Sequence, residues 1–173
     1  MKIFPFPLFP LFRRATLLAL LANLCIVSHV SQTPSEKPMP TLTPYLLLDG
    51  TCQPAMQFYQ ACLGGELTLT LVGDSLMKAA FPASMHHRVV NARLVSGPIT
   101  ISASDWLRPR QTPVQGNTVC LYLSGGTHAE IKTLFDRLAV GADVTDPLRD
   151  EPFGAYGALT DRFGVRWMFH AGR

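Results

Sequence analysis

The sequence predicts an α+β domain made of two copies of a βαβββ unit, each a curved sheet with its helix packed on the outside. Three observations lead to this prediction. The order strand, helix and three strands occurs twice after residue 41. Two segments place apolar residues at the three- to four-residue spacing of a helix, and Phe153–Met168 has the pattern strand, turn, strand.

The first unit begins with an apolar run at residues 42–48, which predicts a strand. Pro54 suits the first turn of the following helix, in which apolar residues recur every three or four positions. The pair Gly64-Gly65 ends this helix. The three remaining strands of the unit are predicted at residues 66–72, 89–95 and 99–103.

The second unit repeats this order. Val119–Leu123 predicts a strand, and Thr127 with Glu130 forms the capping box that starts the next helix. Gly141 ends that helix. The last strands are predicted from Val144 onward and in the hairpin Phe153–Phe169, whose turn is Thr160-Asp161-Arg162.

Residues 1–38 differ from the rest of the chain. A pair of arginines precedes an apolar run at residues 15–27, and a polar, Pro-containing stretch follows. This outline is typical of a secretory signal peptide and predicts export. The alternative is that translation starts at Met39, which predicts a cytoplasmic protein. In both cases we expect the folded domain to be residues 39–173, after an unstructured or signal-like leader.

The distribution of charge and the length of the leader's apolar run bear on two classes of partner, nucleic acids and membranes. The formal net charge of +3 comes from the leader, because residues 39–173 contain 11 basic and 11 acidic side chains. A neutral domain has no basic stripe to neutralise phosphates, so we expect no nucleic-acid partner. The apolar run of the leader is shorter than the ~20 residues that span a bilayer, and we expect no membrane partner for the folded domain.

The cysteines of the domain indicate neither a redox motif nor a disulfide framework. Cys52, Cys62 and Cys120 show no CxxC spacing and lie in apolar patterns, which is typical of buried side chains. Cys52 and Cys62 would lie about 15 Å apart on one helix, at ~1.5 Å per residue, so we expect no disulfide between them.

A family resemblance rests on short motifs that occur in family order. The chain resembles the PhnB-like branch of the vicinal oxygen chelate superfamily, which includes glyoxalase I, bleomycin-resistance proteins and extradiol dioxygenases. The resemblance covers about residues 39–172 and implies two βαβββ modules that form an open cup, usually in a homodimer. The motifs are Thr43-Pro44-Tyr45-Leu46 with Asp49-Gly50, Phe58-Tyr59 with Gly64-Gly65, Asn91-Ala92-Arg93-Leu94, Ser104-Asp105, Gly157, and Asp161-Arg162-Phe163-Gly164-Val165 with Trp167.

The resemblance also bears on metal binding. Metal-using members of the superfamily carry His on a first strand, His or Glu on a later strand and Glu on the final strand. Here the first strand has Tyr45, the later strand has Asn91, and the final strand has Trp167 and Met168. An amide oxygen is a weak ligand for transition metals and a thioether suits soft metals. We therefore expect no metal and no cofactor.

The predicted function is that of a metal-free protein that binds a small organic molecule in the cup. Aromatic walls with a few polar groups suit such a ligand. Each aromatic candidate is also open to interpretation as ordinary core or dimer packing. The candidate pocket residues are Tyr45, Phe81, Asn91, Trp106, Phe153, Tyr156 and Trp167.

Several alternatives stay open at this stage. A metal-dependent lyase, isomerase or dioxygenase follows from superfamily membership alone, and a structural role of the dimer surface is a third possibility. Asp105 is interpreted either as a turn or capping carboxylate or as a polar contact at the rim of the cup. His170 follows the last strand and is a candidate to face the cup.

Overall fold

The computed structural model describes residues 40–108, 110–111 and 113–173. The leader at residues 1–38 and the alternative start Met39 lie outside the described residues. Within the described part of the chain, no helix is both long and apolar enough to cross a membrane.

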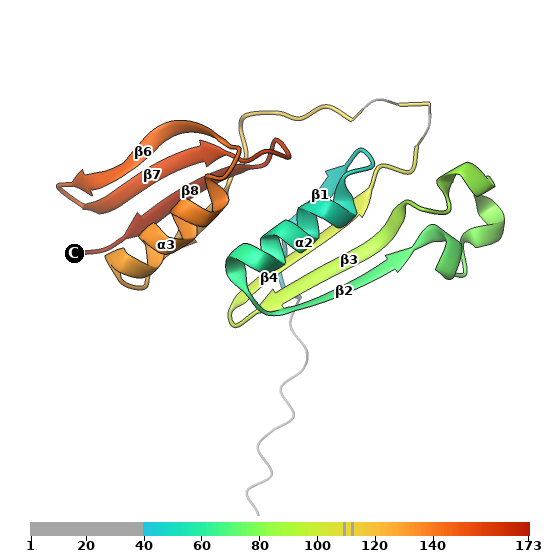
Figure 1. The fold of residues 1–173 in the computed structure, drawn as a ribbon, viewed down its shortest axis with the longest axis horizontal. Helices are drawn as coiled ribbons and strands as arrows, with labels where there is room; N and C mark the ends of the chain where they lie inside the picture. The colour runs from blue at the N-terminus through green and yellow to red at the C-terminus, as the bar shows by residue number, and fades with distance from the viewer. Residues whose placement is uncertain (1–39, 109, 112) are drawn as a thin grey trace, which may run out of the picture. The chain divides into compact units, whose positions relative to one another are not determined.

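The element order confirms the two predicted βαβββ modules (Figure 1). The first module comprises β1 (Tyr45–Leu48), α2 (Cys52–Leu63), β2 (Glu66–Leu71), β3 (Val89–Ser96) and β4 (Ile99–Asp105). The second comprises β5 (Leu121–Ser124), α3 (His128–Leu138), β6 (Asp143–Glu151), β7 (Gly154–Thr160) and β8 (Arg166–Ala171).

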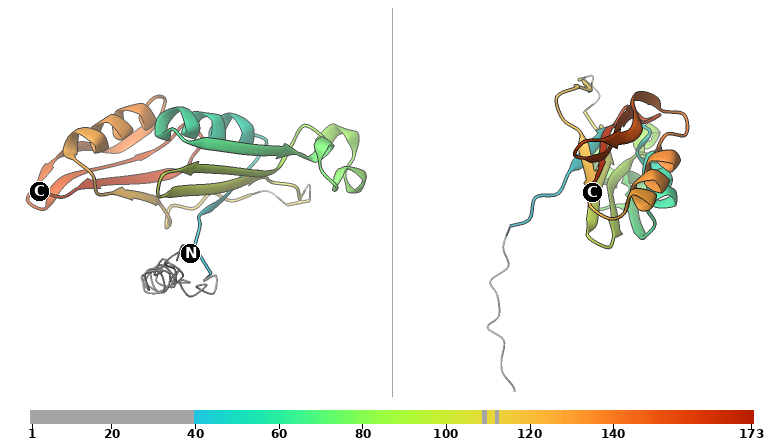
Figure 2. Two further views of the ribbon diagram at one scale, coloured as in Figure 1. Left: turned by 90° about the horizontal axis from the view of Figure 1, so that it is seen from below. Right: turned by 90° about the vertical axis from the view of Figure 1, so that its left-hand side faces the viewer.

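Each module forms a four-stranded mixed sheet, and the two sheets have the same topology. The strand orders are β1-β4-β3-β2 and β5-β8-β7-β6, with the first strand of each module parallel to its last strand. Both sheets are open in the described residues, so β1 and β5 are edge strands. Figure 2 shows α2 and α3 on the same side of the two sheets, which leaves the other sheet face without a helix.

Two predicted strands begin later in the structure than expected. β1 begins at Tyr45 instead of residue 42, since Pro44 has no N–H for a ladder. β5 begins at Leu121 instead of Val119. The stretch 72–88 contains three 3₁₀ turns, η1 (Val72–Asp74), η2 (Lys78–Ala80) and η3 (Ala83–Met85).

The core of each module lies between its sheet and its helix. Alternate residues of every strand point toward the helix, which is why Ala92, Leu94 and Ala103 are fully buried while their neighbours are more exposed. In the second module, Trp167 and Phe169 of β8 are the corresponding buried side chains between sheet and helix.

The helices begin as their sequences predict: Pro54 lies in the first turn of α2, and Thr127 with Glu130 forms a complete capping box for α3.

The N-terminus of α2 is capped by the side chain of Asp105 in β4 and not by its own N-cap residue. The side chain of the N-cap residue Thr51 makes no capping hydrogen bond. Instead the Asp105 carboxyl group, which is 2% exposed, accepts a hydrogen bond from the Cys52 N–H at 3.1 Å. Its second oxygen accepts one from the Val89 N–H at 2.7 Å. Of the two sequence interpretations, the structure shows the capping carboxylate.

A second buried carboxyl group joins the two modules. Asp161 follows β7 and is 4% exposed, and its Oδ2 accepts hydrogen bonds from Tyr59 Oη of α2 at 2.7 Å and Trp167 Nε1 of β8 at 2.8 Å. Its Oδ1 accepts two backbone N–H groups of its own turn. The rings of Tyr59 and Trp167 meet edge to face, and Arg162 lies 3.9 Å from the ring centroid of Phe58. Side chains therefore hold helix α2 against the second module.

Candidate ligand-binding site

The sheet face away from the helices, here called the open face, carries the candidate site. In β1, Tyr45 and Leu47 are about half exposed while Leu48 is buried. In β3 the exposed residues Asn91, Arg93 and Val95 alternate with buried ones. Because strand residues alternate between faces, the five exposed positions lie on the open face and Leu48 lies on the helix side.

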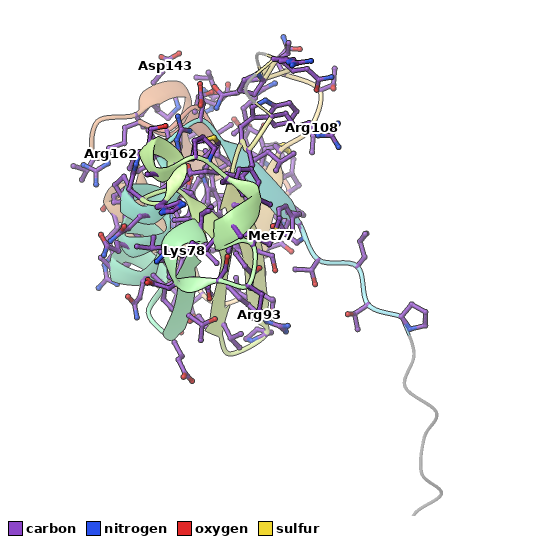
Figure 3. The ribbon with its side chains drawn as sticks, turned by 90° about the vertical axis from the view of Figure 1, so that its right-hand side faces the viewer. Met77, Lys78, Arg93, Arg108, Asp143 and Arg162 are labelled. Carbon is purple, nitrogen blue, oxygen red and sulfur yellow. The ribbon has the colours of Figure 1, made fainter. Side chains whose placement is uncertain are left out.

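A polar row crosses the open face of the first module. The strand registers place Thr68 of β2 opposite Arg93 of β3, Arg93 opposite Ser102 of β4, and Ser102 opposite Tyr45 of β1. Directly opposed residues have Cβ atoms ~4.5–5.5 Å apart, so these side chains are neighbours. Figure 3 shows the Arg93 side chain reaching out from the sheet.

A cavity of about 780 Å³ lies beside this row, between the edge of the first sheet and β5. We call it the seam groove. Its walls combine apolar strand residues with Thr43, Thr100 and Tyr122, and Arg93 is the one charged side chain among the described residues that line it. The groove is lined by Thr41, Leu42, Thr43, Pro44, Arg93, Pro98, Ile99, Thr100, Ile101, Val119, Cys120, Leu121, Tyr122, Leu123 and Trp167.

A smaller cavity continues along the same seam. It has a volume of about 260 Å³ and shares Val119, Cys120 and Leu121 with the seam groove. The β1 strand, including Tyr45, forms one wall. Linker residues Val114, Gln115 and Gly116 line it as well, and Gln115 Nε2 donates a hydrogen bond to the Phe163 carbonyl oxygen at 3.0 Å.

Four rings form an aromatic cluster on the open face of the second module. Tyr122, which also lines the seam groove, stacks on His170 with ring centroids 6.4 Å apart and an angle of 25°. His170 lies 6.0 Å from Phe153, and Phe153 lies 6.1 Å from Tyr156. His170 Nε2 is 3.2 Å from the Phe153 carbonyl oxygen, which holds the imidazole in this place. The cluster extends the aromatic wall of the groove toward the β6–β7 turn.

The structure distributes the seven candidate pocket residues over several places. Tyr45 and Asn91 lie on the open face of the first module, and Phe153 and Tyr156 lie in the aromatic cluster. Trp167 is 1% exposed, because it points toward the helices, although it also lines the seam groove. Contact with a ligand stays a prediction for all seven.

Phe81 and Trp106 belong to loops with their own internal bonding. The Phe81 carbonyl oxygen and that of Lys78 both lie within hydrogen-bond distance of His86 Nε2, at 3.1 and 3.2 Å. His86 thus bridges two backbone carbonyls. Trp106 Nε1 donates to the carbonyl oxygens of Arg108 and Gln111. Both loops are therefore folded back on themselves.

The described residues of one chain contain no cluster of side chains typical of a divalent metal site. Among residues 40–173 without 109 and 112, no three His, Cys, Asp or Glu side chains gather closely enough to hold an ion. Met168 lies on the open face beside Tyr122, and its sulfur is 3.1 Å from Cys120 Sγ. This thiol and thioether pair offers soft sulfur donors instead of the oxygen and nitrogen donors that Mn²⁺, Fe²⁺ or Zn²⁺ sites use.

The cysteines differ in their surroundings. Burial, and then the charge of Asp105, raises the pKa of the Cys52 thiol to about 12. Burial also raises the pKa of Cys62. Both thiols are free and buried, as predicted, whereas Cys120 at the seam is partly exposed. A thiol with a raised pKa is a poor nucleophile, so neither helix cysteine is suited to catalysis.

Comparisons with known proteins extend these observations. No protein-family model matches the chain. It is 30% identical over 140 residues to protein YjdN of Escherichia coli (strain K12), covering 75% of this chain and 93% of YjdN. Protein PA1353 from Pseudomonas aeruginosa is a solved structure with 33% identity, a TM-score of 0.70, and coverage of 78% of this chain and 98% of that one.

Two further solved structures share the fold at lower identity. The PhnB protein from Bacillus cereus has a TM-score of 0.60 and 22% identity, over 77% of this chain and all of that one. A glyoxylase/bleomycin resistance protein/dioxygenase domain from Frankia has a TM-score of 0.55 and 18% identity, over 79% of this chain and all of that one.

Two open βαβββ sheets with the helices on one side define the class of the protein, the vicinal oxygen chelate fold. The similarity to YjdN, PA1353 and the PhnB protein then narrows the assignment. The chain belongs to the PhnB-like branch of the vicinal oxygen chelate superfamily, which confirms the family predicted from its motifs.

Two residues of the site were missed by sequence reasoning. Arg93 has the same parity as Asn91 in an alternating strand, so a shared face could have been inferred. Tyr122 lies in a segment predicted as an apolar strand. Its place on the same sheet face as Met168 and His170 depends on the pairing of β5 with β8. A single strand pattern does not contain that pairing.

Proposed function

We propose that the protein binds a small organic molecule in the seam groove and acts as a binding protein without a metal cofactor. The observation that carries the proposal is the groove itself. Its volume of about 780 Å³ lies within the ~300–1,000 Å³ of small-molecule sites. Its lining is mostly apolar with a few hydroxyl groups and one guanidinium group, which is the composition of such sites.

The aromatic cluster supports the same proposal. Tyr122 and Phe153 are 55% and 59% exposed, so much of each ring is free to contact a ligand. A flat ring that stacks on such a surface gains ~0.5–1.5 kcal/mol beyond the area it buries. Tyr122 belongs to both features and would contact a ligand that fills the groove and extends over His170.

The donor chemistry favours binding over metal-dependent catalysis. A divalent ion needs oxygen or nitrogen donors that converge from several strands, and the described residues of one chain do not supply three of them. The strand positions that the family uses for metal carry Asn91 and Met168. The rival function, a metal-dependent lyase, isomerase or dioxygenase, therefore has the weaker support.

The proposal includes a homodimer. Four large apolar residues of the open face are between 40% and 55% exposed, and a second copy is the simplest partner that would cover them. These residues are Tyr45, Leu47, Val95 and Tyr122. A dimer formed through this face would close the groove from above.

The test is native mass spectrometry of the full chain purified from its source, followed by a thermal-shift screen of small aromatic and aliphatic compounds. We expect a dimer mass, no stoichiometric metal and at least one stabilising compound. Stoichiometric Ni, Zn, Fe or Mn would contradict the metal-free part. A screen without any stabilising compound would contradict ligand binding.

A matched pair of variants locates the site. Tyr122→Ala removes the ring shared by the groove and the aromatic cluster, so it should weaken a compound found in the screen about 10-fold, equivalent to ~1.4 kcal/mol. Leu76→Ala changes a fully exposed side chain next to η1 and should leave binding unchanged. Equal effects of the two variants would place the binding site elsewhere.

A further inference from the structure

We propose that the ligand of the seam groove carries a compact oxyanion group, a carboxylate or phosphoryl group, and that Arg93 is its counter-charge. This inference rests on the proposed function and specifies the chemical class of its ligand. It starts from the position of Arg93, which is the one charged side chain among the described residues that line the groove.

Arg93 lacks the partners that other arginines of the chain have. Arg88 pairs with Asp49 at 2.9 Å, and Arg137 donates to the Cys62 carbonyl oxygen at 3.1 Å. In the described part of the chain, the side chain of Arg93 makes neither an ion pair nor a hydrogen bond. Its planar guanidinium group, with five N–H donors, is therefore available to a ligand.

Hydroxyl groups surround Arg93 on the open face. Thr68 and Ser102 are its direct neighbours on the two adjacent strands, while Thr43 and Thr100 line the groove with it. A guanidinium group binds a carboxylate or phosphoryl group with two parallel hydrogen bonds, and neighbouring hydroxyl groups can donate to the remaining oxygen lone pairs. The polar row thus matches the acceptor pattern of an oxyanion.

The charges nearby do not oppose an anion in the groove. The lining residues include no Asp or Glu within the described chain. The acidic residue of the same sheet face is Glu66, which lies opposite Val95, is solvent-exposed and does not line the groove. Apolar walls around one cation lower the local dielectric constant and strengthen its attraction for an anion.

The shape of the groove also limits the rest of the ligand. Beyond Arg93 its walls are apolar, with Ile99, Leu121 and Leu123 on the facing strand edges and Tyr122 leading to the aromatic cluster. An inorganic anion would fill the polar end and leave these walls exposed to water. The geometry therefore fits an anionic group attached to an apolar or aromatic body.

The experiment uses three probes of similar size and different charge: benzoate, phenylphosphonate and the neutral benzamide. Binding to the full chain is measured by NMR titration or calorimetry at low salt, with inorganic phosphate as a fourth probe. We expect benzoate or phenylphosphonate to bind at least ~10-fold more tightly than benzamide, the effect of one charge-assisted contact. The tighter of the two anions identifies the group as carboxylate or phosphoryl. Inorganic phosphate should bind more weakly than phenylphosphonate.

Variants assign the effect to Arg93. Arg93→Gln should weaken binding of the preferred anion at least ~10-fold while changing benzamide binding less than ~2-fold. The affinity of Arg93→Lys for the anion should lie between those of wild type and Arg93→Gln, because lysine keeps the charge but cannot make two parallel hydrogen bonds. Arg108→Gln is the matched control, since Arg108 is an exposed arginine of the linker that lies apart from Arg93 (Figure 3).

The outcomes separate this inference from the proposal on which it depends. Benzamide that binds as tightly as the anions, or anion binding that survives Arg93→Gln, overturns the oxyanion inference and leaves small-molecule binding in place. Failure of all four probes to bind folded wild-type protein also overturns the inference. Only an empty compound screen would remove the broader proposal.

Discussion

Replacement of Asp161 by alanine should destabilise the protein more than any other single removal of a polar side chain. The Asp161 carboxyl group accepts four hydrogen bonds, from Tyr59 Oη, Trp167 Nε1 and the backbone N–H groups of Phe163 and Val165, at 2.7 to 3.0 Å. These hydrogen bonds join α2 of the first module to the β7–β8 turn and to β8 of the second module. This one side chain is hydrogen-bonded to all three of them.

The magnitude follows from the donors that would be left behind. The Asp161→Ala change leaves the buried Tyr59 hydroxyl and Trp167 N–H without partners, and each unsatisfied buried group costs about 1–3 kcal/mol. The two turn N–H groups are partly buried and can reach water. We expect a loss of about 4 kcal/mol, a large fraction of the ~5–15 kcal/mol of a typical domain.

Equilibrium urea unfolding of Tyr59→Phe, Asp161→Ala and the double variant provides the test. Tyr59→Phe alone should cost about 1–2 kcal/mol, because it removes one hydrogen bond to a buried carboxyl group. In the Asp161→Ala background the same change should cost nothing or recover part of the lost stability, since it removes a buried hydroxyl that has already lost its partner. Additivity of the two changes within ~0.5 kcal/mol, or a loss below 1 kcal/mol for Asp161→Ala, would refute the reasoning.

Three further predictions concern other parts of the chain. Gly65→Ala should lower the free energy of unfolding by at least ~2 kcal/mol in the same urea assay, because Gly65 has a φ of +87° and a Cβ there would strike the Val95 carbonyl oxygen. With an aromatic disulfide reagent at pH 8, Cys120→Ser should remove one reacting thiol per chain, whereas Cys52→Ser should remove none because the pKa of Cys52 is raised to about 12. Burial, and then the charge of Asp161, raises the pKa of Tyr59 above its ordinary 10.0, so the unfolded chain releases that proton first and stability should fall as pH rises above about 10. Urea unfolding between pH 9 and 11 checks this, and Tyr59→Phe should show a smaller fall.

Much of the fold was predictable because its signals are local. The capping box at Thr127, Pro54 in the first turn of α2 and the glycine pair after α2 were read directly from short sequence patterns, and the structure contains all three. The strand boundaries were less accurate where a proline intervened, as at Pro44. Local chemistry fixes the position of an element to within a few residues.

The site was less predictable because it depends on strand pairing. Tyr156 and Phe153 were identified from sequence, but the stacking of Tyr122 on His170 requires β5 to lie beside β8, across more than 40 residues of chain. The turn at Asp161 was predicted as a hairpin turn, and its hydrogen bond to Tyr59 joins residues 102 positions apart. No periodicity within one segment contains such information.

The capping role of Asp105 has a consequence for how the first module forms. Helix α2 ends at residue 63, yet the group that satisfies its first N–H belongs to the last residue of β4. Translation therefore releases the helix long before its cap exists, and the cap arrives only when the final strand docks. Because the same carboxyl group also secures the start of β3, folding of this module should be a single cooperative event and not a stepwise addition of strands.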